Sequence, residues 1–227
     1  MKNILSLLLI LTPALTCSEI VFKSPDDMLE FVKNILPVNP VILEAGGHHG
    51  EDTNRMKSVW QNATMHVFEP LPSSFKKLQE STQNLSDVAL YSYALSDYTG
   101  KVNFYLNPNN DGASSIGYPV EWNKHEFNET PIEVPCITLN NWVDKYNISH
   151  VDFMWLDMEG HELYALQNAS KILDTVKAIY TEVGFVHLRE NSCLYLDLKK
   201  FLEEQGFCEV WKRNLGKFGD ALFIKKN

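Results

Sequence analysis

The 227-residue sequence is short of basic charge, of cysteine and of long hydrophobic runs. It has 20 Lys and Arg residues against 29 Asp and Glu residues, which gives a net charge of −9. Proteins that bind nucleic acid usually present a basic surface because phosphate contacts supply much of their affinity, so we expect no nucleic-acid partner. Four cysteines are too few for a disulfide scaffold. The apolar run at the N-terminus is shorter than the roughly 20 residues that a membrane-spanning helix needs.

The N-terminus has the three parts of a secretory signal peptide. Residues 1–3 are short and basic, residues 4–11 are apolar apart from Ser6, and small residues follow up to Ser18. We therefore predict a removable leader at residues 1–18, a secreted, periplasmic or secretory-pathway location, and no stable membrane span once the leader is removed. A membrane-anchored or cytoplasmic chain is the alternative. Residues 19–227 have the length of one domain, and the whole chain has an ordinary globular composition, 44% hydrophobic and 22% charged.

The body of the chain alternates short apolar runs with segments of helical periodicity, which indicates an α/β sheet with helices on both faces. The last two apolar runs are joined only by a turn, so we expect them to pair antiparallel at the end of a mostly parallel sheet. Residues 107–135 are polar and rich in Pro and Gly, as is typical of a functional loop or insertion. Expected strands are residues 41–43, 65–68, 88–95, 101–106, 151–156, 178–183, 207–212 and 221–225, and expected helices include residues 75–85, 162–173 and 193–204.

The first strand runs into a glycine-rich turn. Gly46 and Gly50 allow a sharp turn and a close approach of the backbone to a ligand, and the helix that follows offers free N–H groups to an anionic group. A dinucleotide fingerprint, G-x-G-x-x-G, is excluded because His48 stands where its second glycine would be. The observed form, Glu44-x-Gly-x-x-x-Gly, suits a smaller ligand that carries a carboxylate and an ammonium, such as S-adenosylmethionine.

Two acidic motifs follow later strands. Glu69 ends the second strand, 19 residues after Gly50, where a carboxylate is placed to accept hydrogen bonds from ribose hydroxyls. Asp157, Glu159 and His161 follow the strand at 151–156, and Asp157 or His161 could take a proton from a hydroxyl or hold a cation. The alternative is that Glu159 and Glu162 only charge the N-terminus of the next helix. A divalent cation is compatible with this motif, but nothing in the sequence indicates a metal site.

These motifs together resemble the FkbM-type methyltransferases, a family of class I S-adenosylmethionine-dependent enzymes. The matching pieces span residues 40–225 and read VILEAGGHHGEDT, VFEPLPSSFKKL, YALSDYTGKVNFY and VDFMWLDMEGHELYALQNASKIL. The resemblance implies a Rossmann-like, seven-stranded sheet whose last pair is an antiparallel hairpin. This chain departs from the family pattern at His48, where the family commonly has Asn, and at Asn168, where it has Gly.

The resemblance also implies roles for individual residues. Glu44, Gly46, His48 and Gly50 would surround the amino-acid end of S-adenosylmethionine. Thr53 would face its carboxylate, Glu69 its ribose and Ala94 its adenine. The catalytic candidates on the acceptor side are Asp157, Glu159 and His161.

The function that the resemblance implies is methyl transfer to a hydroxyl of a small molecule or glycan. The sulfonium methyl group is already activated, so such an enzyme mainly aligns the acceptor oxygen and helps to remove its proton. The alternative is a secreted methyltransferase-like binding module without catalysis. The sequence predicts neither the identity of the acceptor nor the oligomeric state.

Overall fold

The computed structural model describes residues 21–22 and 24–226. The predicted leader at residues 1–18 lies outside the described residues, so the structure does not test it. Within the described part of the chain, no helix has the length and apolar character needed to cross a membrane.

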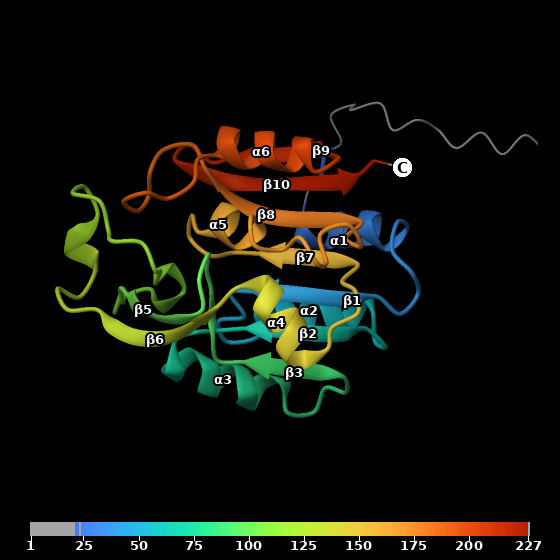
Figure 1. Cartoon of the computed structure of the whole chain (residues 1–227), viewed down its shortest axis with the longest axis horizontal. Helices are drawn as coiled ribbons and strands as arrows, with labels where there is room; N and C mark the ends of the chain where they lie inside the picture. Colours follow the sequence, from blue (N-terminus) through green and yellow to red (C-terminus); the bar gives the residue numbers. More distant parts are fainter. Residues whose placement is uncertain (1–20, 23, 227) are drawn as a thin grey trace, which may run out of the picture.

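Seven strands form the central sheet in the order β3-β2-β1-β7-β8-β10-β9. Neighbouring strands from β3 to β8 pair parallel, and β10 pairs antiparallel with both β8 and β9. The strands are β1 (Val41–Ala45), β2 (Thr64–Phe68), β3 (Val88–Tyr91), β7 (Phe153–Leu156), β8 (Ala178–Gly184), β9 (Phe207–Asn214) and β10 (Phe218–Lys225). The predicted mostly parallel sheet with an antiparallel C-terminal hairpin is confirmed, and β10 points opposite to the parallel strands in Figure 1.

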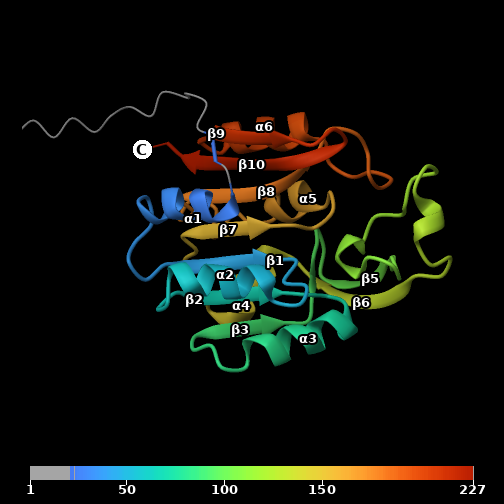
Figure 2. The same cartoon turned by 180° about the vertical axis from the view of Figure 1, so that it is seen from behind.

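Helices cover both faces of this sheet, as predicted. The hydrophobic residues of α4, α5 and α6 pack in one core, and those of α1, α2 and α3 pack in a second core on the opposite face. Figures 1 and 2 show these two helical layers from the front and from behind. The helices are α1 (Pro25–Lys33), α2 (Glu51–Val59), α3 (Pro72–Thr82), α4 (Leu139–Tyr146), α5 (Glu162–Leu166) and α6 (Tyr195–Glu204).

The two central strands read as continuous apolar runs because both of their faces are covered. In β1, Ile42 packs in the core beneath α1–α3 and Leu43 packs in the core beneath α4–α6. In β7, Phe153 packs in the core beneath α1–α3 and Met154 packs in the core beneath α4–α6. Successive side chains of a strand point to opposite faces, so an unbroken apolar run supplies both cores.

A second, three-stranded sheet has the order β4-β6-β5 and includes β4 (Ala94–Leu95), β5 (Gly100–Phe104) and β6 (Ile132–Ile137). The prediction of one strand at 88–95 was wrong, because β3 ends at Tyr91 and β4 pairs with β6 instead. The prediction of a loop through residue 135 was also wrong. Pro135 argues against a strand, but β4 pairs only with residues 136 and 137, so one side of β6 is unpaired where the proline lies.

The helix predicted at 162–173 was too long. The α-helix ends at Leu166, and the chain continues through tight turns in which Ala169 and Ile172 are fully buried. The carbonyl oxygen of Asn168 accepts a hydrogen bond from the Asn140 backbone N–H at 2.8 Å, so this turn docks against the start of α4. Helical apolar spacing is shared by short buried turns, which is why the pattern overestimated the helix.

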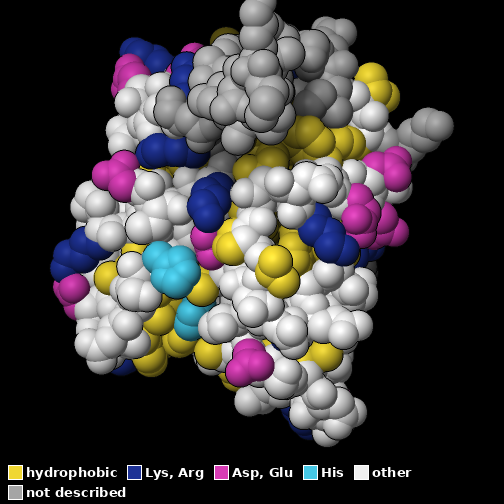
Figure 3. Space-filling view, turned by 90° about the vertical axis from the view of Figure 1, so that its right-hand side faces the viewer, with side chains coloured by type: hydrophobic (Ala, Val, Ile, Leu, Met, Phe, Trp, Pro, Cys, Tyr) yellow, Lys and Arg dark blue, Asp and Glu magenta, His cyan; other side chains and the backbone are white. Residues whose placement is uncertain are grey.

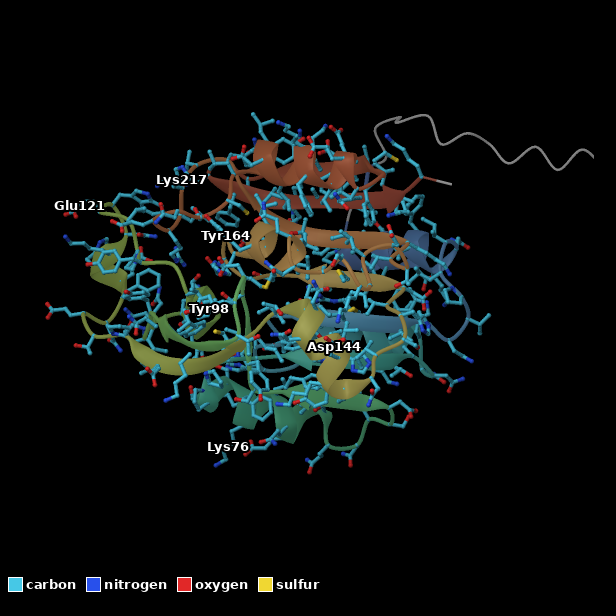
Figure 4. The ribbon with its side chains drawn as sticks, in the orientation of Figure 1. Lys76, Tyr98, Glu121, Asp144, Tyr164 and Lys217 are labelled. Carbon is cyan, nitrogen blue, oxygen red and sulfur yellow. The ribbon has the colours of Figure 1, made fainter. Side chains whose placement is uncertain are left out.

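Residues 105–131, the β5–β6 segment, connect the two long strands of the small sheet. The segment contains two short 3₁₀ helices, Asp111–Ala113 and Lys124–Glu126. In Figure 1 it projects from the end of the molecule toward which the parallel strands point. Figure 4 shows Glu121 and Lys217 at this same end, and the Lys217 ammonium lies 3.4 Å from the centre of the Trp122 ring. The segment therefore contacts the β9–β10 turn and covers the carboxyl ends of the strands.

Candidate functional site

A cavity of about 380 Å³ lies at the carboxyl ends of the central strands, beneath the β5–β6 segment. Its walls come from the loops after β1, β2 and β7, from residues 93–95 and from residues 110–116. Ligands of open α/β sheets bind at this edge, and the volume is in the range of small-molecule sites. The cavity is therefore the candidate site.

Eight of the ten residues predicted for the site line this cavity, and two do not. Gly50 and Thr53 lie outside its lining. Residues far apart in the sequence are thus brought to one place by the parallel order of β2, β1 and β7. The eight lining residues are Glu44, Gly46, His48, Glu69, Ala94, Asp157, Glu159 and His161.

The glycine-rich turn is held against the neighbouring strands on both sides. The backbone N–H groups of Gly46 and Gly47 both donate to the Phe68 carbonyl oxygen, at 3.0 and 2.9 Å. Gly46 has a left-handed φ of 92°, and a Cβ atom there would lie 2.1 Å from the Asp157 carbonyl oxygen. A side chain at this position would therefore separate β1 from the turn that carries Asp157.

Gly50 serves the packing of the same turn. It is the N-cap residue of α2 with a φ of 92°, and a Cβ atom there would lie 2.4 Å from the Ser81 hydroxyl oxygen of α3. This glycine allows α2 and α3 to approach each other, which places it behind the cavity wall.

Glu44 is completely buried and has one carboxylate oxygen without a partner. Its Oε2 accepts a hydrogen bond from the Thr53 hydroxyl at 2.6 Å, while its Oε1 has no hydrogen bond. Burial raises the pKa of this carboxyl well above its ordinary value. Buried polar atoms are nearly always satisfied, so an unpartnered acceptor in a cavity wall points to a ligand donor such as an ammonium. Thr53 orients Glu44 from behind.

Glu69 is fixed by the backbone on two sides. Its Oε1 accepts from the Leu71 N–H at 2.8 Å, and its Oε2 accepts from the His48 N–H at 2.9 Å. Burial raises its pKa to about 7, although these two hydrogen bonds act in the opposite direction. A carboxylate oxygen accepts more than one hydrogen bond, so both oxygens retain capacity for ligand hydroxyls.

The turn after β7 is organised by Glu162. This buried carboxylate accepts from the backbone N–H groups of Met158, at 2.8 Å, and Gly160, at 3.4 Å. Glu159 and Gly160 both have left-handed backbone conformations, with φ of 57° and 96°. The backbone hydrogen bonds of Glu162 stabilise this tight reversal and so position Asp157 and Glu159 on the cavity floor.

The cavity floor is strongly acidic. Asp157 is open to the cavity, and desolvation by the surrounding walls, followed by the charges of Glu159 and Glu162, raises its pKa well above the ordinary value. Burial also raises the pKa of Glu159 to about 7, although Arg189 opposes this shift. His161 has its pKa lowered to about 4 by burial, so its imidazole is neutral at neutral pH. Crowded carboxylates of this kind favour a cationic ligand.

Arg189 is a site residue that the sequence did not reveal. Its buried guanidinium donates to the Ala113 carbonyl oxygen at 2.5 Å and to Glu159 Oε2 at 2.9 Å, and it lies 4.6 Å from the centre of the Phe127 ring. It therefore ties the β5–β6 segment to the turn after β7. No local pattern marks this arginine, because its partners lie 76 and 30 residues away in the sequence.

The sequence profile of the Methyltransferase FkbM domain matches residues 44–208, which is more than half of the chain. The chain belongs to the FkbM methyltransferase family. The resemblance seen in the sequence is confirmed, and the chain is accordingly an S-adenosylmethionine-dependent methyltransferase.

Individual relatives of this FkbM methyltransferase are distant. It is 26% identical over 186 residues to 2-O-methyltransferase NoeI of Sinorhizobium fredii, with 74% of this chain and 75% of that protein covered. The structure of Methyltransferase FkbM from Methylobacillus flagellatus matches with a TM-score of 0.59 at 15% identity, over 88% of this chain and 48% of that one. This chain therefore spans about half the length of that structure.

A third match is fibrillarin from Aeropyrum pernix, solved with natively bound S-adenosyl-L-methionine. Its TM-score is 0.51 at 12% identity, and the match covers 87% of this chain and 73% of that one. At such identities the solved structures show a shared fold, which agrees with the sheet described above.

The raised pKa values predict opposite pH trends for stability and cofactor binding. Glu69 and Glu159 titrate near pH 4.5 when unfolded and near 7 when folded, so the folded state holds more protons between these values. The free energy of unfolding should therefore fall as the pH rises through this window. Binding of the cationic cofactor should strengthen over the same window, because the carboxylates become charged.

Thermal unfolding between pH 5.5 and 7.5, with and without S-adenosylmethionine, measures both trends. The Glu69→Gln variant serves as the control, because it removes one of the two titrating groups and should flatten the pH dependence of the unfolding temperature. An unfolding temperature of the free protein that rises across this range would contradict the expectation.

Proposed function

We propose that this chain transfers the methyl group of S-adenosylmethionine to a hydroxyl oxygen of a small molecule or glycan. The observation that carries the proposal is one cavity in which the unpartnered Glu44 oxygen, the Glu69 carboxylate and the Asp157 carboxylate converge. In this proposal the first two bind the cofactor and the third faces the acceptor.

The residues present fit the cofactor. S-adenosylmethionine supplies a methyl group that is activated by its positive sulfonium centre. Glu44 would hold the ammonium group through its free Oε1, and Glu69 would accept hydrogen bonds from the ribose hydroxyls. Gly46 lines the cavity without a side chain, and Ala94 lines the wall where the adenine would lie.

Asp157 is the candidate for proton removal from the acceptor. It lies at the carboxyl end of β7 and faces the cavity. The positive charge of the cofactor would favour its ionised form despite its raised pKa. The ionised carboxylate would accept the proton that the acceptor hydroxyl loses. His161, which lies 3.4 Å from the Ser96 hydroxyl, would help to orient the acceptor.

Several features support a neutral, polyhydroxylated acceptor. Glu159, which lies close to Asp157, and Ser114 add polar groups to the cavity wall, and such groups bind hydroxyls. The net charge of −9 argues for a small acceptor over a nucleic acid. On the face opposite the cavity, Figure 3 shows Lys and Arg side chains interspersed with Asp and Glu. The Sinorhizobium relative is a 2-O-methyltransferase by name, which supports a hydroxyl as the acceptor group.

Calorimetry with S-adenosylmethionine, followed by transfer of a labelled methyl group to a panel of glycans and hydroxylated metabolites, tests the proposal. We expect micromolar binding that Glu69→Gln weakens by about tenfold or more, since hydrogen bonds to a charged group contribute about 1.5–3 kcal/mol. The matched control is Glu121→Gln, at an exposed position outside the cavity lining, which should leave the affinity unchanged. Absence of cofactor binding would refute the proposal, and binding without transfer to any acceptor would favour a non-catalytic binding module.

We also propose that the chain enters a secretory route, on the basis of its predicted leader at residues 1–18. Asn-x-Ser/Thr sequons would accept glycans only in a eukaryotic secretory route, and four of the five place their asparagine at an exposed position. The mass of the protein recovered from a secreting host tests it, because leader cleavage and glycosylation both change the mass. The exposed asparagines are Asn62, Asn84, Asn128 and Asn147, and Asn168 is half-buried.

A further inference from the structure

Two adjacent histidines of the glycine-rich turn share one carboxylate. The rings of His48 and His49 stack with their centres 3.6 Å apart and their planes 20° apart. His48 Nε2 lies 2.8 Å from Asp111 Oδ1, and His49 Nε2 lies 3.0 Å from Asp111 Oδ2. Asp111 belongs to the β5–β6 segment, so this carboxylate joins that segment to the glycine-rich turn.

These contacts determine which ring nitrogens are free. An ionised carboxylate only accepts hydrogen bonds, so His48 Nε2 carries its hydrogen to bond with Asp111. His49 Nε2 can donate to Asp111 Oδ2 at 3.0 Å or accept from the Lys77 ammonium at 3.1 Å, and Lys77 also reaches Asp111 Oδ2 at 3.5 Å. When both Nε2 atoms donate to Asp111, each imidazole presents the lone pair of its Nδ1 on the opposite side.

Both Nδ1 atoms lie close to Glu51. His48 Nδ1 is 3.5 Å from Glu51 Oε2, and His49 Nδ1 is 3.7 Å from Glu51 Oε1. One ligand atom from each of these three residues lies within 4.8 Å of the others. Two ligands of one tetrahedral zinc ion, each about 2.0–2.2 Å from the metal, are about 3.4 Å apart. The observed separations are therefore compatible with a shared cation. Because the ring planes are only 20° apart, the two Nδ1 lone pairs run nearly side by side, and binding of one ion requires one ring to rotate toward the other.

We propose that His48, His49 and Glu51 bind a divalent transition-metal ion such as Zn²⁺. Two imidazole nitrogens and a carboxylate are a common donor set for such ions, with water completing the coordination. Asp111 supplies the outer carboxylate that fixes the rings, an arrangement that usually accompanies histidine ligands. The His48, His49 and Glu51 side chains are 32%, 25% and 59% exposed, so an ion can reach them from solvent.

A second group of potential ligands is less suitable. Asp157, Glu159 and Glu182 also lie close together, but they offer only carboxylates, and Glu159 is already paired with Arg189 at 2.9 Å. The histidine group differs because both Nε2 atoms contact the Asp111 carboxylate. Among the described residues, the Nδ1 atoms have Glu51 as their nearby partner, at 3.5 and 3.7 Å. An ion bound by His48, His49 and Glu51 would strengthen the link between the glycine-rich turn and the β5–β6 segment.

The test is calorimetric titration of the untagged full chain, stripped with EDTA, with ZnCl₂. We expect one saturable site per chain, weakened at least about tenfold by His49→Ala and by Glu51→Gln. Asp111→Asn should weaken it by about 10–100-fold, the usual effect of removing an outer carboxylate. The control is His150→Ala, since His150 lies before β7 at the opposite edge of the sheet and bonds to Ser149.

Thermal unfolding provides a second measurement. Zn²⁺ should raise the unfolding temperature of the wild-type chain and of His150→Ala, and it should have little effect on Glu51→Gln. Equal unfolding temperatures of all variants in EDTA would show that they are folded. The proposal is overturned if the wild-type chain shows no saturable site at about 100 μM Zn²⁺, a weak affinity for such a donor set, or if His49→Ala and Glu51→Gln bind the ion as the wild type does.

Discussion

The Gly46→Ala variant is expected to lose S-adenosylmethionine binding, by about 100-fold or more. Its new Cβ atom would lie 2.1 Å from the backbone carbonyl oxygen of Asp157, and a backbone atom cannot rotate away. The glycine turn and the turn after β7 would have to separate, and both belong to the cavity wall. A misplacement of about 1 Å in such a site can cost roughly 100-fold.

The Gly216→Ala variant separates this clash from simple backbone strain. Gly216 also has a left-handed φ, of 106°, but a Cβ atom there would meet nothing within 4 Å. Both variants carry the cost of a left-handed alanine, about 1–2 kcal/mol, and only Gly46→Ala carries the clash. Calorimetry should therefore show unchanged cofactor affinity for Gly216→Ala. Circular dichroism confirms that each variant is folded, and near-normal affinity of folded Gly46→Ala would contradict the expectation.

The second large effect is expected for Asp157→Asn, which should lower kcat by about 100-fold or more. Loss of a positioned base typically costs 10²–10⁴-fold, and an amide of the same shape cannot take up the proton. Removing a charge that Glu159 and Glu162 repel should not lower the stability of the chain. The variant should therefore fold and bind the cofactor within a few-fold of the wild type.

Measurement of kcat at saturating acceptor, together with the cofactor Kd, distinguishes these effects. The matched control is Asp144→Asn on α4, where the aspartate is 59% exposed and pairs with Lys171 (Figure 4). That variant should behave as the wild type in both measurements. A normal kcat for Asp157→Asn would show that another group, such as His161, removes the proton.

The parts of the site that follow a strand directly were accessible from the sequence. Glu44, Glu69 and Asp157 each stand in or after a short apolar run, and parallel strands end at the same edge of a sheet. Their convergence in one cavity followed from that rule. The different positions of Glu44, in the cavity wall, and Thr53, behind it, did not follow from that rule. A hydroxyl that supports a carboxylate from behind has the same sequence signal as a hydroxyl that contacts a ligand.

The parts that depend on tertiary packing were not accessible. Arg189 acts through contacts with Ala113 and Glu159, and its surrounding sequence has no pattern that indicates them. Strand β6 was hidden because Pro135 weakens its signal, and its stability depends on the burial of Val134 and Cys136 against the β4 and β5 side chains. Local patterns report which side chains are apolar but not which distant segment covers them.

The two ends of the β5–β6 segment determine how easily the segment can change in length. The segment leaves from Phe104 and returns at Ile132, and these two residues are directly paired across antiparallel strands. Its ends are thus held together independently of its length, and the entropy of closing a flexible loop grows only slowly as residues are added. Insertions and deletions between these two positions should therefore leave the seven-stranded sheet intact, whereas residues 110–116 belong to the cavity wall and must be kept for it. The segment is therefore able to vary in length at one hairpin without disturbing the strands that carry Glu44 and precede Glu69 and Asp157.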